Sequence, residues 1–236
     1  MSKLANYFLK KYYANQLHPY RNFEARVQSL LSKDSVLLDA GCGRTAPVLQ
    51  KYLGKAGKLI GVDLVDFIEP LPGLTLRKAD LSHIPVADSS VDIVMSRSVF
   101  EHLDDPLAVY QEVFRILKPG GRVVFLTANA WDYATIIARI IPNRFHPAIV
   151  ARVEGRDESD VFPTRYRTNS FRSVKKLALA TGFTLENFEY LSQYPNYLMF
   201  SGVLFFLGMC YEKLIAHFKT LNFLKGWILV VLRKPV

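Results

Sequence analysis

Short apolar runs of strand length recur along the first half of the chain, separated by stretches of mixed polarity. They lie at 36–38, 58–63, 74–80, 91–96 and 122–127. Between the last two runs, apolar residues at helical spacing follow Asp104-Asp105-Pro106, a favourable helix start, and end before Lys118-Pro119-Gly120-Gly121. Strands that alternate with helices predict a parallel sheet covered on both faces, and therefore an α/β fold.

The first apolar run leads into a glycine-rich turn, 39–45, and a helix is expected from about Ala46 to Gly54. Such a turn lets the backbone approach a ligand closely and directs the unpaired N–H groups of the helix start toward it. Asp63 ends the following strand, where an acid can accept hydrogen bonds from a ribose diol. Ligands of such sheets bind outside the carboxyl ends of the strands, which here carry Asp39, Asp63, Asp80 and Ser96.

The N-terminal segment, 1–31, is expected to be helical, with a break at His18-Pro19 and an aromatic face. This face either packs against the sheet or forms a lid over the ligand. The lid interpretation places four side chains near the ligand: Tyr13, His18, Tyr20 and Arg21.

The regular alternation stops between 129 and 169, where an apolar helix, 131–141, precedes a run of mixed charge. An insert at this point of a doubly wound sheet would hang over the ligand site. We therefore expect it to form a cap that contacts the second substrate. For residues 154–158 a solvated charged loop is the alternative.

A helix at 170–181 and strands at 183–191 and 227–233 follow, and the two strands enclose an insert at 192–226. From 197 to 211 the insert carries no charge, yet it is shorter than the ~20 residues that span a bilayer. It is expected either to dock as buried surface, on the domain or on a second subunit of a homodimer, or to make a peripheral membrane contact through 197–225.

Composition narrows the class of protein. The 236 residues suffice for one large domain, expected to span 1–236, and 50% of them are hydrophobic, which excludes a disordered chain. The formal net charge of +9 predicts an acidic partner such as anionic lipid, a phosphorylated substrate or nucleic acid. Two cysteines without metal-ligand spacing, and an N-terminus without a signal peptide's apolar core, predict a metal-free cytoplasmic protein, or one peripheral on the cytoplasmic membrane face.

Further motifs occur in a fixed order: Leu38-Asp-Ala-Gly-Cys-Gly43, Gly61-Val-Asp63, Ala79-Asp-Leu81, Val99-Phe-Glu-His-Leu103 and Leu117-Lys-Pro-Gly-Gly121. At these spacings the segment 36–127 resembles the class I S-adenosylmethionine-dependent methyltransferases, in the branch that shares the methyltransferase domain of the ubiquinone and menaquinone C-methyltransferases. The resemblance implies S-adenosylmethionine as cofactor. It also implies a doubly wound, mostly parallel seven-stranded sheet with an antiparallel last strand and helical cap inserts.

The resemblance also implies which residues bind the cofactor. The expected contacts are Asp39, Gly41, Cys42, Gly43 and Thr45 with its methionine and ribose part, Asp63 and Leu64 with the ribose hydroxyls, Asp80 and Leu81 with the adenine, and Ser96 and Arg97 beside the sulfonium and the acceptor. The family often has a third glycine at the position of Thr45. A threonine is tolerated there if its φ is negative, and its hydroxyl would bind the ligand or cap the next helix.

Methyl transfer needs the acceptor atom in line with the methyl group, and a base only if the acceptor must lose a proton. The candidate bases are His146, Tyr166 and His102, in that order, although a histidine placed like His102 more often packs beside the cofactor or orders its loop. Other expected acceptor contacts are Trp131, Asp160, Arg165 and Arg167. Asp92 and Glu101 are interpreted as structural acids that fix loops through backbone N–H groups.

Several function classes stay open on the sequence. A methyltransferase that acts on a small-molecule or lipid-linked acceptor, O- or C-directed, agrees best with the apolar insert. The positive charge suggests an RNA methyltransferase, but the basic residues are scattered and no base-methylating motif follows the fourth strand, so nucleic acid is the less favoured partner. A non-catalytic protein that keeps the cofactor fold is a third class. A NAD-dependent dehydrogenase would need Gly-x-Gly-x-x-Gly, whose last place is Ala46 here.

Overall fold

A computed structural model describes residues 2–68, 72–140 and 162–236 of the protein. The strands are β1 (Val36–Ala40), β2 (Lys58–Asp63), β3 (Thr75–Lys78), β4 (Val91–Arg97), β5 (Leu117–Ala128), β6 (Thr184–Leu191) and β7 (Trp227–Arg233). The helices are α1 (Lys3–Tyr12), α2 (Pro19–Leu30), α3 (Pro106–Ile116), α4 (Tyr133–Ile140), α6 (Phe171–Thr181) and α7 (Gly202–His217). Short 3-10 helices are η1 (Leu49–Tyr52), η2 (Phe100–His102), η5 (Asn196–Leu198) and η6 (Lys219–Leu224).

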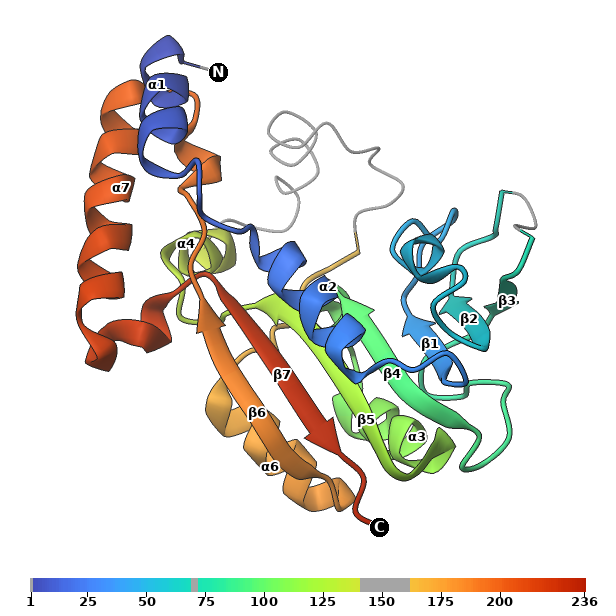
Figure 1. The fold of residues 1–236 in the computed structure, drawn as a ribbon. Coiled ribbons are helices and arrows are strands. Elements are labelled where there is room, and N and C mark those ends of the chain that lie inside the picture. The colour runs from blue at the N-terminus through green and yellow to red at the C-terminus, as the bar shows by residue number, and fades with distance from the viewer. Residues whose placement is uncertain (1, 69–71, 141–161) are drawn as a thin grey trace. The chain divides into compact units, whose positions relative to one another are not determined.

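The seven strands form one sheet in the order β3-β2-β1-β4-β5-β7-β6, which confirms the predicted fold class (Figure 1). β1 pairs in parallel with β2, where Asp39 lies opposite Gly61, and in parallel with β4, where Asp39 lies opposite Met95. The strand order therefore changes direction between β1 and β4. The expected antiparallel last strand is β7, which runs against its neighbours (Figure 1). Asp39 thus lies at the switch point of the sheet, outside which doubly wound folds bind ligands.

The contacts divide the chain into two compact units that are interleaved in sequence. The first unit comprises Met1–Pro19, Ala128–Thr164 and Tyr190–Ile228. The second comprises Tyr20–Thr127, Arg165–Glu189 and Leu229–Val236. Neither unit is a continuous stretch, so each depends on segments that lie far apart in sequence. A single domain over 1–236 remains a prediction.

The second unit is a sheet covered on both faces. α2 lies across one face, and α3 and α6 lie side by side on the other (Figure 1). Strands β1, β2 and β4 are almost entirely buried, as expected for central parallel strands. Aromatic rings join the helices to the sheet, with Phe100 stacked on Phe125 at 4.5 Å and Tyr110 against both rings. This packing holds the carboxyl ends of the strands at one edge.

The prediction of a helix from Ala46 to Gly54 is wrong, because only the short 3-10 helix η1 forms there. Ala46 has a φ of +46° and Gly54 a φ of +73°, so both ends of the segment leave the right-handed helical region. Pro47 contributes to this because a residue before proline avoids the α region.

The segment predicted only as the end of a helix, 118–121, is already part of β5, which begins at Leu117. The register between β4 and β5 shifts here, with Val91 opposite Leu117 but Ile93 opposite Arg122. The amine of Lys234 donates to the carbonyls of Phe114 and Leu117, both at 2.8 Å, and so caps the end of α3. Contacts with the distant C-terminus therefore decide the structure of this stretch.

The first unit is built on the helix pair α1 and α7. Its buried cluster comprises Ala5 from α1, Met199 and Phe205, with Phe8 and Tyr13 packed against it. The predicted break of the N-terminal helix at His18-Pro19 is confirmed, because α1 ends at Tyr12 and α2 begins at Pro19. No helix in the described part of the chain has the length and hydrophobicity that crossing a membrane requires.

Candidate functional site

The glycine-rich turn after β1 is fixed by backbone contacts within the second unit. Gly41 has a φ of +85°, and a Cβ at this position would lie 2.3 Å from a methyl carbon of Val99. No side chain fits there. The N–H groups of Gly41 and Cys42 both donate to the carbonyl of Val62 on β2, at 2.8 and 3.2 Å. The turn is therefore shaped by β2 and by the segment after β4, independently of a ligand.

Asp63 ties the end of β2 to this turn. One carboxylate oxygen accepts the N–H of Gly43 at 2.7 Å, and the other accepts the N–H of Val65 at 3.2 Å. A carboxylate has about four acceptor positions, so two remain for ligand hydroxyl groups. Asp63 can therefore hold the turn and a ribose diol at the same time.

Asp39 is the buried acid of the site. Its side chain is 2% exposed, and its Oδ2 atom has no hydrogen-bond partner in the described part of the protein. Burial raises the pKa of this carboxyl to about 7, with a smaller contribution from Asp63, while the guanidinium of Arg97 acts in the opposite direction. A buried carboxylate oxygen without a partner suits a ligand that brings a cationic or N–H donor group, such as the amino group of a methionine.

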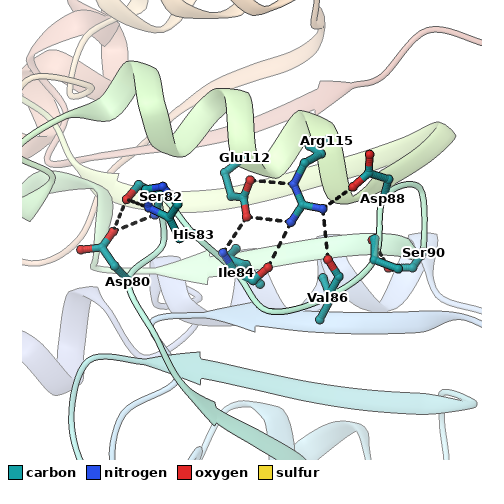
Figure 2. A network of polar contacts seen from close by, with 10 residues as sticks. Asp80, Ser82, His83, Ile84, Val86, Asp88, Ser90, Glu112 and Arg115 are labelled. Carbon is teal, nitrogen blue, oxygen red and sulfur yellow. Dashed lines mark hydrogen bonds and ion pairs between the residues drawn. The ribbon is translucent and has the colours of Figure 1, made fainter.

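Asp80 follows β3 and opens an irregular loop, shown in Figure 2. One of its oxygens accepts both the N–H and the hydroxyl of Ser82, each at 2.7 Å, while the other points away from the loop (Figure 2). The hydrogen bonds from Ser82 lower the pKa of the Asp80 carboxyl. Asp80 is therefore an ionised acceptor, as the predicted contact with an adenine amino group requires.

A Glu112–Arg115 pair on α3 holds this loop in place (Figure 2). Two nitrogens of Arg115 donate to Glu112, both at 2.8 Å, and one donates to the carbonyl of Ile84 at 3.0 Å. Glu112 in turn accepts the N–H of Ile84 at 2.6 Å. Sequence reasoning missed this pair, because an i,i+3 acid and base on a helix look like an ordinary solvated ion pair.

Ser96 and Arg97 are the last two residues of β4, and Ser98 follows directly after the strand. The hydroxyl of Ser96 is buried and donates to the carbonyl of Ala40 at 2.7 Å, so this side chain locks β4 to β1. The guanidinium of Arg97 lies 4.2 Å from the ring centre of Tyr20 and 3.5 Å from an oxygen of Glu24, both on α2. Ser98 has a φ of +57°, a strained conformation that is common at functional sites.

The remaining residues of the predicted cofactor set differ in exposure. The thiol of Cys42 faces Gly61 in the core, burial raises its pKa, and only its backbone can meet a ligand. Leu81 is buried, whereas Leu64 is exposed beside Asp63 and offers an apolar surface. Thr45 is not among the described residues with a positive φ, so the negative φ that a threonine needs at this position is present.

A buried polar network next to the site was missed from the sequence. The amide of Asn169 donates to the hydroxyl oxygen of Thr127 at 2.8 Å, and that hydroxyl donates to the carboxylate of Glu101. The hydroxyl of Thr168 donates to the carbonyl of Phe100 at 2.9 Å. The carboxylate of Glu101 thus accepts a side-chain hydroxyl inside the buried network, while its predicted contacts with backbone N–H groups stay a prediction. Asp92 accepts the N–H of Val36 at 2.8 Å, as predicted.

Two candidate bases lie close to this network. The carbonyl of Glu101 accepts the N–H of Tyr166 at 3.0 Å, and His102 follows Glu101 in η2. Tyr166 has a φ of +52°, another strained position. The structure thus brings the segments of His102 and Tyr166 together, and their catalytic role stays a prediction. His146 and Asp160 lie outside the described residues.

The predicted acceptor contacts fall into both units. In the second unit, Arg165 donates to the carboxylate of Asp104 at 2.6 Å and Arg167 donates to its carbonyl, so both arginines are tied to the loop before α3. Tyr20 and Arg21 belong to the same unit. The first unit holds the other three expected residues, Tyr13, His18 and Trp131. The lid over the ligand therefore stays a prediction.

The ring of Tyr13 packs against Tyr194 and Phe205 at 6.1 and 6.3 Å, and burial raises the pKa of its hydroxyl. Trp131 is half-exposed. Among the residues that the structure describes, no group of three His, Cys, Asp or Glu side chains is placed to hold a metal ion.

Comparisons with known proteins agree with this geometry. Residues 38–125 match the model of a family described as a methyltransferase domain. A probable S-adenosylmethionine-dependent methyltransferase of Mycolicibacterium smegmatis is 33% identical over 98 residues, which cover 39% of this chain and 38% of the relative. A ubiquinone biosynthesis O-methyltransferase of Methylococcus capsulatus is 32% identical over 128 residues, covering 46% and 53% respectively. The chain thus spans about half, or less, of the length of these curated relatives.

A solved structure of an S-adenosylmethionine-dependent methyltransferase from Mesorhizobium loti is also similar, with a TM-score of 0.59 and 19% identity over 93% of this chain and 99% of that one. At this identity the likeness shows the fold. The fold is that of the class I α/β methyltransferases. Residues 38–125 thus match a methyltransferase domain, and the relatives and structural neighbours of the chain include S-adenosylmethionine-dependent methyltransferases.

Proposed function

We propose that this protein transfers a methyl group from S-adenosylmethionine to a small-molecule or lipid-linked acceptor, at an oxygen or carbon atom. The observation that carries the proposal is the group of acids at neighbouring strand ends, where Asp39 has an unpartnered buried oxygen and Asp63 and Asp80 keep free acceptor positions. Three acceptors of this kind match the amino, ribose and adenine groups of the cofactor.

The cofactor supplies a methyl group that is already activated by its positive sulfur, so the protein mainly has to position the acceptor. Arg97 at the end of β4 and Ser98 just after it border the expected reaction centre. Arg97 is held by Tyr20 and Glu24, which fixes its charge in one place. A positive group here also favours the ionised form of Asp39.

A base is needed only if the acceptor loses a proton. His102 and Tyr166 are the described candidates, on segments joined through Glu101. His146 stays a candidate on the sequence alone. Replacing His102 by Gln and Tyr166 by Phe separates these roles, since loss of a base lowers kcat and changes its pH dependence while cofactor affinity is kept.

An apolar or amphipathic acceptor is favoured because the segment 197–225 is rich in exposed apolar side chains. One relative is named as a ubiquinone biosynthesis O-methyltransferase, and we propose that the methyl acceptor of this protein is likewise lipid-like. The reaction is proposed to take place in the cytoplasm, with the protein peripheral on the membrane face. A homodimer through the same segment is the competing arrangement.

The test is a titration of the protein with S-adenosylmethionine by calorimetry, followed by a mass-spectrometric search of a cell extract for a molecule that gains one methyl group. We expect saturable binding and one such small or lipid-like molecule. If the protein binds the cofactor and the methylated product is RNA, the acceptor is RNA and not a small or lipid-linked molecule. Cofactor binding without any methylated product would favour a non-catalytic protein. If no cofactor binds, the proposal fails.

A further inference from the structure

α7 is apolar on the face that the first unit leaves uncovered. Its buried side comprises Gly202, Phe205, Gly208, Met209, Glu212 and Ile215. On the opposite side, Val203 is 67% exposed, Leu207 is 57% exposed and Leu214 is 52% exposed. These positions are spaced four and seven residues apart, so they form one stripe along the helix. An ordinary surface helix would carry charged residues there.

α1 extends this apolar surface. The rings of Phe8 on α1 and Phe206 on α7 lie 5.5 Å apart, so the two helices present their side chains next to each other. Further exposed apolar residues of α1, α7 and the segments around α7 are Leu4, Tyr7, Tyr12, Phe200, Leu204, Phe218 and Phe223. We call this surface the α1/α7 face. Exposed apolar surface that is gathered in this way marks an interaction site.

Among the lysines, aspartates and glutamates of α1, α7 and their flanking segments, the exposed ones are all lysines. Residues 2–19 and 196–226 contain six lysines, which are Lys3, Lys10, Lys11, Lys213, Lys219 and Lys225, and a single acid, Glu212. Glu212 is 5% exposed and belongs to the buried side of α7. The amine of Lys213 lies 4.3 Å from the ring centre of Tyr12, so charge and aromatic surface alternate across the two helices.

We propose that the α1/α7 face docks on the surface of an anionic lipid bilayer, with α1 and α7 in the plane of the interface. Apolar and aromatic side chains enter the boundary between head groups and acyl chains, and the lysines meet the lipid phosphates. α7 has 16 residues, fewer than the ~20 that span a bilayer, which agrees with a helix that lies on the membrane. The inference does not depend on which acceptor is methylated.

A second copy of the chain is the less favoured occupant. A two-fold interface brings the same patch of both copies together, and here it would place positive charges against positive charges. Nucleic acid would accept the lysines and stack on the aromatic rings, but it offers no apolar phase to aliphatic side chains such as Val203 and Leu207. A lipid surface satisfies the charge and the apolar stripe together.

The test is sedimentation of the full chain with extruded vesicles of phosphatidylcholine, with and without 30% phosphatidylglycerol as an anionic lipid (about one lipid in three, so that a polybasic surface is attracted). We expect binding to the anionic vesicles, weak binding to neutral ones, and a loss of binding as the salt concentration rises. Absence of binding to anionic vesicles at low salt would overturn the inference. Size-exclusion chromatography of the same sample measures whether the protein is a dimer. A stable dimer that does not bind vesicles would also overturn the inference.

Matched variants separate the apolar and the charged contributions. Leu207→Glu should weaken vesicle binding by roughly tenfold, since it puts a charge where burial in lipid is expected. Leu179→Glu, at a residue of α6 that is 70% exposed, is the control and should change nothing. Equal binding by Leu207→Glu and the control protein would contradict the docking surface.

The charged contribution is tested with Lys10→Gln, Lys11→Gln and Lys213→Gln in one protein. Its binding to anionic vesicles should fall by at least about tenfold, because each lysine near the surface contributes. The charge-matched control replaces the exposed Lys33, Lys175 and Lys176 of the second unit by Gln. If both triple variants lose binding equally, the attraction comes from net charge and the proposed face is wrong.

Discussion

The two compact units bury carboxyl groups in contrasting surroundings. In the second unit, Asp39 stands at the end of β1 beside a positively charged arginine and next to a glycine turn, where a ligand is expected. In the first unit, Glu212 lies on the buried side of α7 close to Asp132, and the exposed side of the same helix is apolar. Burial raises the pKa of both carboxyls, of Asp39 to about 7 and of Glu212 to about 8.

The contrast teaches that a raised pKa alone does not mark a ligand site. Both groups pay a desolvation cost in the folded protein. Only Asp39 combines burial with a backbone turn and neighbouring acids at the ends of β2 and β3. Neutralising Asp39 should therefore change cofactor binding, whereas neutralising Glu212 should change stability.

The largest effect is expected from Asp39→Asn. Removing the carboxylate should weaken cofactor binding by roughly 3–5 kcal/mol, the cost of breaking a buried charge pair. In the unchanged protein, affinity should rise with pH between about 6 and 7.5, because the carboxyl whose pKa is about 7 must lose its proton to bind a cation. Calorimetry at several pH values measures both effects, and Asp34→Asn on the surface is the control. A variant with unchanged affinity would remove Asp39 from the site.

Asp63→Ala should come next. The ribose loses its acceptor and the N–H of Gly43 loses its partner at 2.7 Å, so cofactor affinity should fall by ~1–3 kcal/mol. Asp66→Ala is the matched control, since Asp66 is an exposed neighbour that pairs with Lys78. Should both variants bind the cofactor like the parent, the ribose contact is not made by Asp63.

Glu212→Gln tests the other side of the comparison. A carboxyl whose pKa is higher in the folded than in the unfolded protein stabilises the fold at low pH, and this stabilisation is lost as the pH rises toward the folded pKa of about 8. The pKa of Asp132 is raised to about 6, so stability should fall between about pH 4 and 8. Other groups that act electrostatically together with Glu212 are Tyr13, Tyr133, Tyr211 and Lys225.

Glu212→Gln removes the titration of the Glu212 carboxyl. Its melting temperature at pH 8.5 should exceed that of the parent by roughly 2–4 °C, with a smaller difference at pH 5 and unchanged cofactor affinity. Thermal unfolding followed by circular dichroism measures the shift, and Glu186→Gln on the surface of β6 is the control. A variant that is less stable than the parent at pH 8.5 would show that the charged form of Glu212 is stabilising.

Arg115→Ala should have the smallest effect on binding. Arg115 positions the loop after Asp80 without being expected to touch the cofactor, so affinity should fall by roughly 0.5–1 kcal/mol through loss of order in that loop. Arg122→Ala is matched to it, because Arg122 also forms an ion pair with a glutamate, Glu186 at 2.9 Å, on the surface of the sheet. Equal affinities of the two variants would mean that Glu112 alone holds the loop.

The sequence by itself determined the order of the strands along the chain and placed α3 and α6, because apolar runs and helix caps are local signals. The helix at 170–181 and the strand at 227–233 follow from a few neighbouring residues, such as the N-cap Ser170 and the left-handed Gly182 that ends α6. The placement of Asp39 and Asp63 was also predictable, since the ends of parallel strands meet at one edge of a sheet.

Only the tertiary structure decided how the side chains at that edge are held. The carboxylate of Glu101 accepts the hydroxyl of Thr127 on β5, and its carbonyl accepts the N–H groups of Arg165 and Tyr166. Arg97 contacts Tyr20 and Glu24 on α2. These partners are far apart in sequence, which hides them. η1, in contrast, is short because Ala46 is left-handed, and Pro47 next to it is a local signal against a longer helix. The tertiary structure also decided which side of α7 is exposed, because a helix that is apolar all round carries no periodic signal of its orientation.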